Sequence, residues 1–211
     1  MDQITTIYQA VLEGDAAGTK EAVTVALQAG LAANTIMQDG LIAAMAEVGR
    51  QYESGDFFVP EMLIAARAMS AGLELLKPLL AQSGIKTTGR VIIGTVKGDL
   101  HDIGKNLVGM MLEGAGFEVI DLGTDVTPQK FVDAVNQRKP QLIAMSALLT
   151  TTMSNMGNTI KALNDAGVRD QVKVMIGGAP VTDSYAKQIG ADGFAPDASS
   201  AARLAKSLVE A

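Results

Sequence analysis

The sequence contains no cysteine, no tryptophan and only one histidine, His101, in 211 residues. Without cysteine, the chain has no disulfides, no iron–sulfur ligands and no thiol nucleophile, which agrees with a reducing compartment. Structural and catalytic zinc takes three or four protein ligands, mostly cysteine and histidine, so an ordinary zinc site is excluded as well. Any metal chemistry in this chain has to work with a single imidazole.

The chain also lacks an excess of basic residues and long apolar runs. Its formal net charge is −6, so no basic face exists to bind a phosphate backbone or an anionic membrane surface. The N-terminus has no basic region followed by an apolar stretch, and no later run is long enough to span a bilayer. We therefore expect a cytoplasmic protein with no nucleic-acid partner and no membrane association.

Helical periodicity extends through residues 2–81. Apolar residues such as Met37, Leu41, Met45 and Val48 recur at the spacing of one helical face. Breaks at residues 14–15, 30–34 and 55–56 divide this region into four helices, the last beginning at 59–61. Because the connections are short, an antiparallel four-helix bundle over residues 1–85 is predicted.

The pattern changes after residues 83–89, which have the small and polar composition of a linker. Short apolar strands then alternate with amphipathic helices, which is typical of a parallel sheet covered on both faces. The strands are expected at 91–96, 117–122, 141–148, 172–177 and 192–195, and the helices near 104–115, 128–138, 153–166, 182–189 and 198–209. The predicted fold class is α/β, with a five-stranded flavodoxin/Rossmann-like domain at 90–211.

Three loops of unusual composition follow strands of this domain. In the flavodoxin-like strand order 2-1-3-4-5, ligands bind outside the carboxyl ends of the first and third strands. The first loop carries Gly98, Asp99 and His101, and the third carries a hydroxyl-rich segment at 146–152. The fourth strand ends in a pair of glycines at 177–178, where missing side chains would let a bulky ligand lie against the backbone. We expect the functional site at this edge.

The His101 loop favours a macrocyclic cofactor. A lone imidazole is sufficient as the protein ligand where a haem or a corrin supplies the other ligands, and Asp99 is placed to fix the tautomer of His101. Two plainer interpretations stay open: a surface histidine, and Asp99 as a helix N-cap or turn residue.

The stretch from Gly98 to Lys105 is not a P-loop, because five residues separate its glycines and Asn106 stands where Ser or Thr should follow the lysine. Asp121 and Asp125, after the second strand, are interpreted as turn formers.

Three segments in order resemble a known motif. Asp99-x-His101-x-x-Gly104, then Ser146-x-Leu148 after 41 residues, then Gly177-Gly178 after 28 more, resembles the cobalamin-binding motif of corrinoid proteins of methyltransferase systems, such as the methylamine and methanol corrinoid proteins, and of cobalamin-dependent methionine synthase. The resemblance extends to the helical half, where residues 57–62 are similar to the opening of the last helix in those proteins.

The resemblance implies roles for individual residues. His101 would be the lower ligand of cobalt in place of the cofactor's own base, with Asp99 and Thr152 completing a catalytic relay. Methionine synthase has serine at the position of Thr152. The helical half would cover the upper face of the methylated cofactor through Phe58 and Met62. The remaining expected cobalamin contacts are Gly98, Asp102, Ile103, Gly104, Ser146, Leu148, Thr150, Gly177, Gly178 and Ala195.

The function that the resemblance implies is that of a methyl carrier, a subunit that is not catalytic alone. It would take a methyl group from a substrate-specific methyltransferase and deliver it to an acceptor methyltransferase that uses tetrahydrofolate or coenzyme M, with a reductive activation protein as a further partner. Methylamines, methanol, glycine betaine and methoxylated aromatics are all plausible donors. Three alternatives stay open: the cobalamin subunit of an adenosylcobalamin-dependent mutase, a cobalamin-sensing module and a haem binder.

Overall fold

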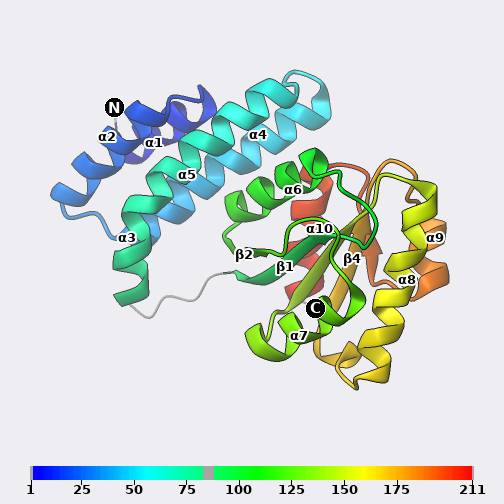
Figure 1. The fold of residues 1–211 in the computed structure, drawn as a ribbon. Coiled ribbons are helices and arrows are strands. Elements are labelled where there is room, and N and C mark those ends of the chain that lie inside the picture. The colour runs from blue at the N-terminus through cyan, green and yellow to red at the C-terminus, as the bar shows by residue number, and fades with distance from the viewer. Residues whose placement is uncertain (1, 83–87, 211) are drawn as a thin grey trace. The chain divides into compact units, whose positions relative to one another are not determined.

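The structure, a computed structural model, describes residues 2–82 and 88–210. The chain divides into two compact units, Met1–Thr87 with Glu113–Gly116 and Thr88–Leu112 with Phe117–Ala211 (Figure 1). Most of the expected linker, including the predicted boundary near residue 85, lies outside the described residues. No helix in the described ranges has the length and apolar character needed to cross a membrane.

The first unit is helical, as the periodicity predicts. Its elements are α1 (Gln3–Leu12), α2 (Ala16–Gln28), α3 (Ala33–Thr35), η1 (Ile36–Ile42), α4 (Ala43–Ser54) and α5 (Val59–Gln82). The predicted breaks have local causes. Asp15 caps α2 by accepting a hydrogen bond from the Gly18 N–H at 2.9 Å, and Gly55 ends α4 in the left-handed region at φ 82°. Since α3, η1 and α4 run on without a break, the unit has the four helical segments expected.

The segment η1 is a π-helix, which the sequence pattern did not predict. Its buried residues include three in succession, Gly40, Leu41 and Ile42, where an α-helix of the expected face would bury every third or fourth residue. A π-helix holds more residues in each turn, so the buried stripe is wider here. Gly40 faces α1 closely, because a Cβ at this position would lie 3.0 Å from a methyl carbon of Ile7.

The core of this unit is built from large side chains with almost no exposure, among them Ile7, Leu41, Met45, Met62, Met69 and Leu76.

The second unit is a five-stranded parallel sheet in the order β2-β1-β3-β4-β5, as predicted. The strands are β1 (Gly89–Thr95), β2 (Phe117–Asp121), β3 (Leu142–Ser146), β4 (Lys173–Gly177) and β5 (Gly193–Phe194). The helices are α6 (Ile103–Gly114), α7 (Pro128–Arg138), α8 (Thr150–Asp165), the short 3-10 helix η2 (Arg169–Gln171), α9 (Asp183–Ile189) and α10 (Ala198–Glu210).

Helices cover this sheet on both faces (Figure 1). Side chains of α7, α8 and α9, including Phe131, Met156 and Ala186, share one buried cluster with strand residues such as Ile92 and Ile143. The helix α10 contacts β3, β4 and β5. A sheet buried on both faces explains why its strands are continuous apolar runs in the sequence.

The register of the strands places the candidate residues at one edge. Thr95 at the end of β1 pairs with Ser146 at the end of β3, and Ser146 pairs with Gly177 at the end of β4. The three loops singled out in the sequence therefore leave the sheet at the same level.

Two predicted boundaries at this edge are wrong. The third strand ends at Ser146 instead of residue 148, and the following helix begins at Thr150 instead of 153. Consecutive threonines at 150–152 have β-branched side chains, which favour a strand. The helix begins early because its first turn is capped by a side chain from another loop, which is described next.

Candidate functional site

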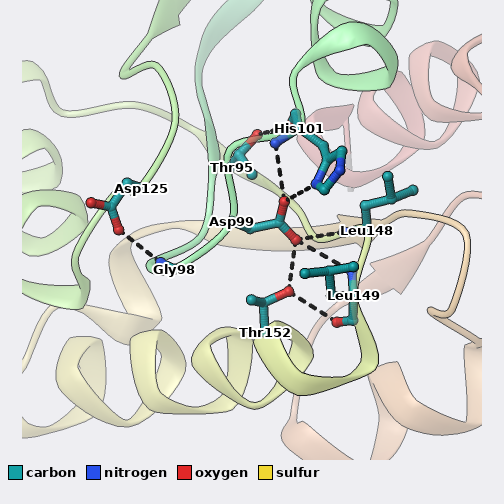
Figure 2. Close-up of polar contacts among 8 residues, drawn as sticks. All are labelled: Thr95, Gly98, Asp99, His101, Asp125, Leu148, Leu149 and Thr152. Carbon is teal, nitrogen blue, oxygen red and sulfur yellow. Dashed lines mark hydrogen bonds and ion pairs between the residues drawn. The ribbon is translucent and has the colours of Figure 1, made fainter.

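The loop between β1 and α6 carries His101 and is held by hydrogen bonds on several sides (Figure 2). Gly98 has a φ of 82°, a conformation that glycine adopts without a steric cost. The fully buried hydroxyl of Thr95 donates to the backbone carbonyl of His101 at 2.9 Å, and the Val96 N–H donates to the Ser146 carbonyl at 3.0 Å. These two hydrogen bonds hold the His101 loop at the carboxyl ends of β1 and β3.

Asp99 is a fully buried carboxylate whose two oxygens both accept hydrogen bonds. Oδ1 lies 2.8 Å from the ring Nδ1 of His101 and 3.1 Å from the His101 backbone nitrogen. Oδ2 accepts from the backbone N–H groups of Leu148 at 2.8 Å and Leu149 at 3.3 Å, and from the Thr152 hydroxyl at 2.7 Å. This arrangement brings together Asp99, His101 and Thr152, the three residues for which the resemblance implies a relay.

The carboxylate of Asp99 also caps a helix, although a different one from the helix that follows it in sequence. Its Oδ2 accepts hydrogen bonds from the N–H groups of Leu148 and Leu149, and Leu149, the N-cap residue of α8, provides no capping side chain of its own. An anionic group at a helix N-terminus is stabilised by the free N–H groups and the helix dipole. This contact, made across about 50 residues of sequence, explains why α8 begins earlier than predicted.

The surroundings of Asp99 favour its ionised form. Burial alone would raise the pKa of this carboxyl, but the hydrogen bonds from Thr152, Leu148 and His101 outweigh burial and hold the pKa well below its usual range. The carboxylate is therefore a fixed acceptor at neutral pH. Because an ionised carboxylate can only accept, the His101 nitrogen that faces it carries the hydrogen, and the second ring nitrogen, Nε2, has its lone pair available in the neutral imidazole.

The His101 side chain itself is 53% exposed, in contrast to its buried partner. Four large apolar residues near His101 are also exposed, three in the loops after β1 and β3 and one at the start of α6: Leu100, Leu148, Leu149 and Ile103. Ile103 is 84% exposed and Leu100 is 73% exposed, which is unusual for side chains of this size. An oriented imidazole within an apolar surface fits a large, mainly apolar ligand that offers a metal to Nε2.

The donor set leads to the same conclusion. Within residues 2–82 and 88–210, no three His, Asp or Glu side chains converge to hold a metal ion. A metal at His101 would have to bring its remaining ligands with it, as the metal of a macrocycle does. The residues present therefore fit a metal macrocycle.

The glycines at the end of β4 have a packing role beside the predicted one. A Cβ at Gly178 would lie 1.9 Å from the Ala147 carbonyl oxygen, and a Cβ at Gly177 would lie 3.1 Å from the Ala195 carbonyl oxygen. With its φ of 133°, Gly178 is in a region that other residues rarely adopt. Gly178 is thus required for close backbone approach between neighbouring loops, whether or not a ligand is present, and Gly177 lies in a tight contact of the same kind.

The other predicted contacts lie at the same edge or in the helical unit. Asp102 accepts a hydrogen bond from the Asn106 amide at 3.1 Å, and a Cβ at Gly104 would meet nothing within 4 Å. Thr150 is exposed in the first turn of α8, and Ala195 is buried after β5.

The two residues expected to form a cap differ in exposure. Phe58 is 66% exposed and Met62 is completely buried. Of this pair, Phe58 is the one whose side chain is available to a ligand.

Sequence reasoning missed several residues that support the loop. Asp125 was interpreted as a turn former, and it does adopt a positive φ of 52°, but its Oδ1 also accepts from the Gly98 N–H at 2.7 Å. Asp121 forms the expected turn, accepting from the Gly123 N–H at 2.8 Å, and it also pairs with Lys105, whose side chain is buried. A lysine on the buried face of a helix is a signal that could have shown the need for an acidic partner.

Comparisons with known proteins identify the family of this chain. Residues 89–204 match a family described as B12 binding domain, and residues 3–77 match a second family with the same description. Trimethylamine corrinoid protein 2 of Methanosarcina acetivorans is 46% identical over 202 residues, 95% of this chain and 93% of the relative. Dimethylamine corrinoid protein 1 of the same organism is 44% identical over 194 residues, 90% and 91% of the two chains.

A solved structure matches the fold over almost the whole chain. It is the methanol:cobalamin methyltransferase complex MtaBC from Methanosarcina barkeri, in which the matched chain gives a TM-score of 0.87 at 32% sequence identity. The match covers 99% of this chain and 80% of that one.

Proposed function

Because this chain belongs to the family of B12-binding corrinoid proteins, whose cofactor is cobalamin, we propose that it carries a methyl group on cobalamin between two methyltransferases. The observation that carries the proposal is the half-exposed His101, oriented by a buried carboxylate and surrounded by exposed apolar side chains. With the family established, a corrin replaces haem as the macrocycle for this imidazole.

In this proposal, each residue of the site has a part. His101 would hold the cobalt through Nε2 in place of the cofactor's own base, and Asp99 holds the imidazole through Nδ1. The exposed side chains of Leu100, Ile103 and Leu148 would hold the apolar face of the corrin. The residues that would hold the displaced base and its nucleotide tail are Gly98, Asp102, Gly104, Ser146, Thr150, Gly177, Gly178 and Ala195.

When bound, cobalamin supplies a cobalt ion that accepts a methyl group from one donor and releases it to another acceptor. His101 would hold the metal through Nε2, and the strength of that bond would depend on the proton at Nδ1. Asp99 keeps that proton in place because its pKa is low, and Thr152 keeps Asp99 ionised by donating a hydrogen bond to it. Between them, the three residues set how strongly the imidazole binds the metal.

The partners follow from the carrier role. A carrier needs a donor enzyme and an acceptor enzyme, and the relatives are named for trimethylamine, dimethylamine and methanol. We propose a donor methyltransferase specific for one of these small methylated compounds, an acceptor methyltransferase that uses tetrahydrofolate or coenzyme M, and a protein that restores the reduced cofactor.

A single-turnover experiment tests the carrier role. The protein is reconstituted with cobalamin, reduced, and incubated separately with the methanol, trimethylamine and dimethylamine methyltransferases, each with its 14C-methyl substrate. With one of them, about one labelled methyl group per bound cobalamin should travel with the reisolated protein and leave when an acceptor methyltransferase is added. His101→Ala, loaded with cobalamin, is the control and should transfer more slowly. A protein that binds cobalamin but takes up no label with any donor enzyme would contradict the proposal.

A further inference from the structure

Asp125 forms hydrogen bonds with two neighbouring residues of the His101 loop, Gly98 and Asp99. It lies in the connection between β2 and α7, and its Oδ1 accepts a hydrogen bond from the Gly98 N–H at 2.7 Å (Figure 2). Its own backbone N–H donates to the carbonyl oxygen of Asp99 at 3.0 Å. Asp99 is therefore held at two points: its backbone by Asp125, and its carboxylate by the start of α8.

The backbone of Asp125 limits which residues can occupy this position. Its φ of 52° is one of two positive values among the non-glycine residues that the structure describes, the other being 48° at Lys139. Left-handed backbone is costly for most residues and is tolerated best by Asn and Asp. Asp125 is exposed, and its contact with Gly98 needs only an oxygen that accepts a hydrogen bond. The amide oxygen of an asparagine could therefore accept the same bond.

The rest of the loop is held from other directions. The Asn155 side-chain amide donates to the Lys97 carbonyl at 2.8 Å, and the Thr95 hydroxyl donates to the His101 carbonyl at 2.9 Å. In this network Asp125 is the anchor for Gly98, whose positive φ sets the direction in which the chain enters Asp99. Loss of that anchor would free the segment whose orientation determines where the imidazole points.

We propose that Asp125 is a positioning residue for His101, which fixes the Gly98–Asp99 backbone so that the imidazole is oriented before the cofactor binds. The proposal deepens the function proposed above and rests on it for the role of His101 as a cobalt ligand. A loop that is already ordered loses less conformational entropy when a ligand binds, so affinity rises without a new contact to the ligand.

Four full-length variants separate this role from a general effect on folding. Asp125→Ala removes the acceptor and leaves a β-carbon in left-handed backbone, whereas Asp125→Gly removes the acceptor and relieves the backbone. Asp125→Asn keeps both an acceptor and the backbone preference. Lys139→Ala is the matched control, because it places alanine in the same kind of backbone at the end of α7.

The first measurement uses the protein without cofactor. Amide hydrogen exchange at Gly98 should be at least about tenfold faster in Asp125→Ala and Asp125→Gly than in the wild type, because the N–H loses its acceptor. Asp125→Asn and Lys139→Ala should exchange at close to the wild-type rate.

The second measurement uses protein labelled with 15N and loaded with cobalamin in the Co(II) state. Electron paramagnetic resonance reports the fraction of cobalt coupled to a protein nitrogen. That fraction should fall in Asp125→Ala and Asp125→Gly, cobalamin should bind roughly 2- to 10-fold more weakly, and Asp125→Asn should restore both quantities.

The outcomes keep the two proposals apart. Unchanged Gly98 exchange together with an unchanged coupled fraction in Asp125→Gly would overturn the positioning role, even if Asp125→Ala does not fold. A wild-type protein with no coupling to protein nitrogen would overturn the ligand role of His101, while the Gly98 exchange data would still decide whether Asp125 orders the loop.

Discussion

The loop that carries His101 and the connection between α4 and α5 are both held by side-chain hydrogen bonds, but over very different distances along the chain. In the α4–α5 connection, Ser54 bonds to Asp56 and the Phe58 N–H bonds to Glu61, two and three residues apart. In the His101 loop, Gly98 bonds to a residue 27 positions away and Asp99 to Thr152, 53 positions away. A local contact stabilises one helix end, whereas these long-range contacts exist only when β1 has paired with β2 and β3.

The largest difference is expected between a glycine at the sheet edge that carries the His101 loop and a glycine in the α4–α5 connection. Gly178→Ala places a Cβ against the backbone oxygen of Ala147, which cannot move without disturbing β3. We expect a loss on the order of 4 kcal/mol or more in the free energy of unfolding. Gly55→Ala, also at positive φ but with open space around it, should cost about 1 kcal/mol. Urea unfolding followed by circular dichroism measures both, and equal losses would argue against the tight approach at Gly178.

The hydroxyl of Thr152 should come next in size. Thr152→Val keeps the shape of the side chain but removes the hydrogen bond to the buried carboxylate of Asp99, which we expect to cost about 1.5–3 kcal/mol of stability. Thr152→Ser keeps the donor and should stay much closer to the wild type. If valine and serine have the same effect, the hydroxyl does not support Asp99.

The Thr152 comparison should also depend on pH. The pKa of Asp99 is lowered in the folded protein, so the stability gained from its ionised form is fully present above the pKa of an unfolded aspartate, about 3.9, and is lost as the pH falls below it. The unfolded state is the same for the wild type and Thr152→Val, so their stability difference should be constant near neutral pH, where Asp99 is ionised in both folded proteins. It should shrink on acidification, once Asp99 takes up a proton in the folded variant. Unfolding of the apoprotein across this range measures it; a gap that widens on acidification would have the wrong sign.

The smallest effect is expected in the helical unit. Phe58 is exposed and makes its local hydrogen bond through the backbone, so Phe58→Ala should change the stability by less than about 1 kcal/mol. If Phe58 covers the upper face of the cofactor, the variant loaded with methylcobalamin should lose its methyl group to light faster than the wild type. Substitution of the buried Met62 should instead destabilise the unit. Equal photolysis rates in Phe58→Ala and the wild type would remove Phe58 from the proposed cap.

The same contrast explains what the sequence could predict. The helices with local caps, the strand order and the edge that carries Gly98, Ser146 and Gly177 follow from periodicity and topology. The start of α8 could not be predicted, because its cap is Asp99, about 50 residues earlier. The supporting roles of Asp125 and Thr95 could not be predicted either, because their contacts depend on the register of the sheet and their residue types give no distinctive signal. The π-helix at 36–42 gave no signal in the apolar spacing.

The central claim is that His101, oriented by Asp99, coordinates the cobalt of the bound cofactor. Electron paramagnetic resonance of the Co(II) form tests it most directly, with the protein labelled with 15N and the cofactor unlabelled. The unpaired electron should couple to one 15N nucleus in the wild type, and that coupling should disappear in His101→Ala while cobalamin remains bound. Coupling to 14N from the cofactor's own base in the wild-type protein, or an unchanged 15N signal in His101→Ala, would contradict the account.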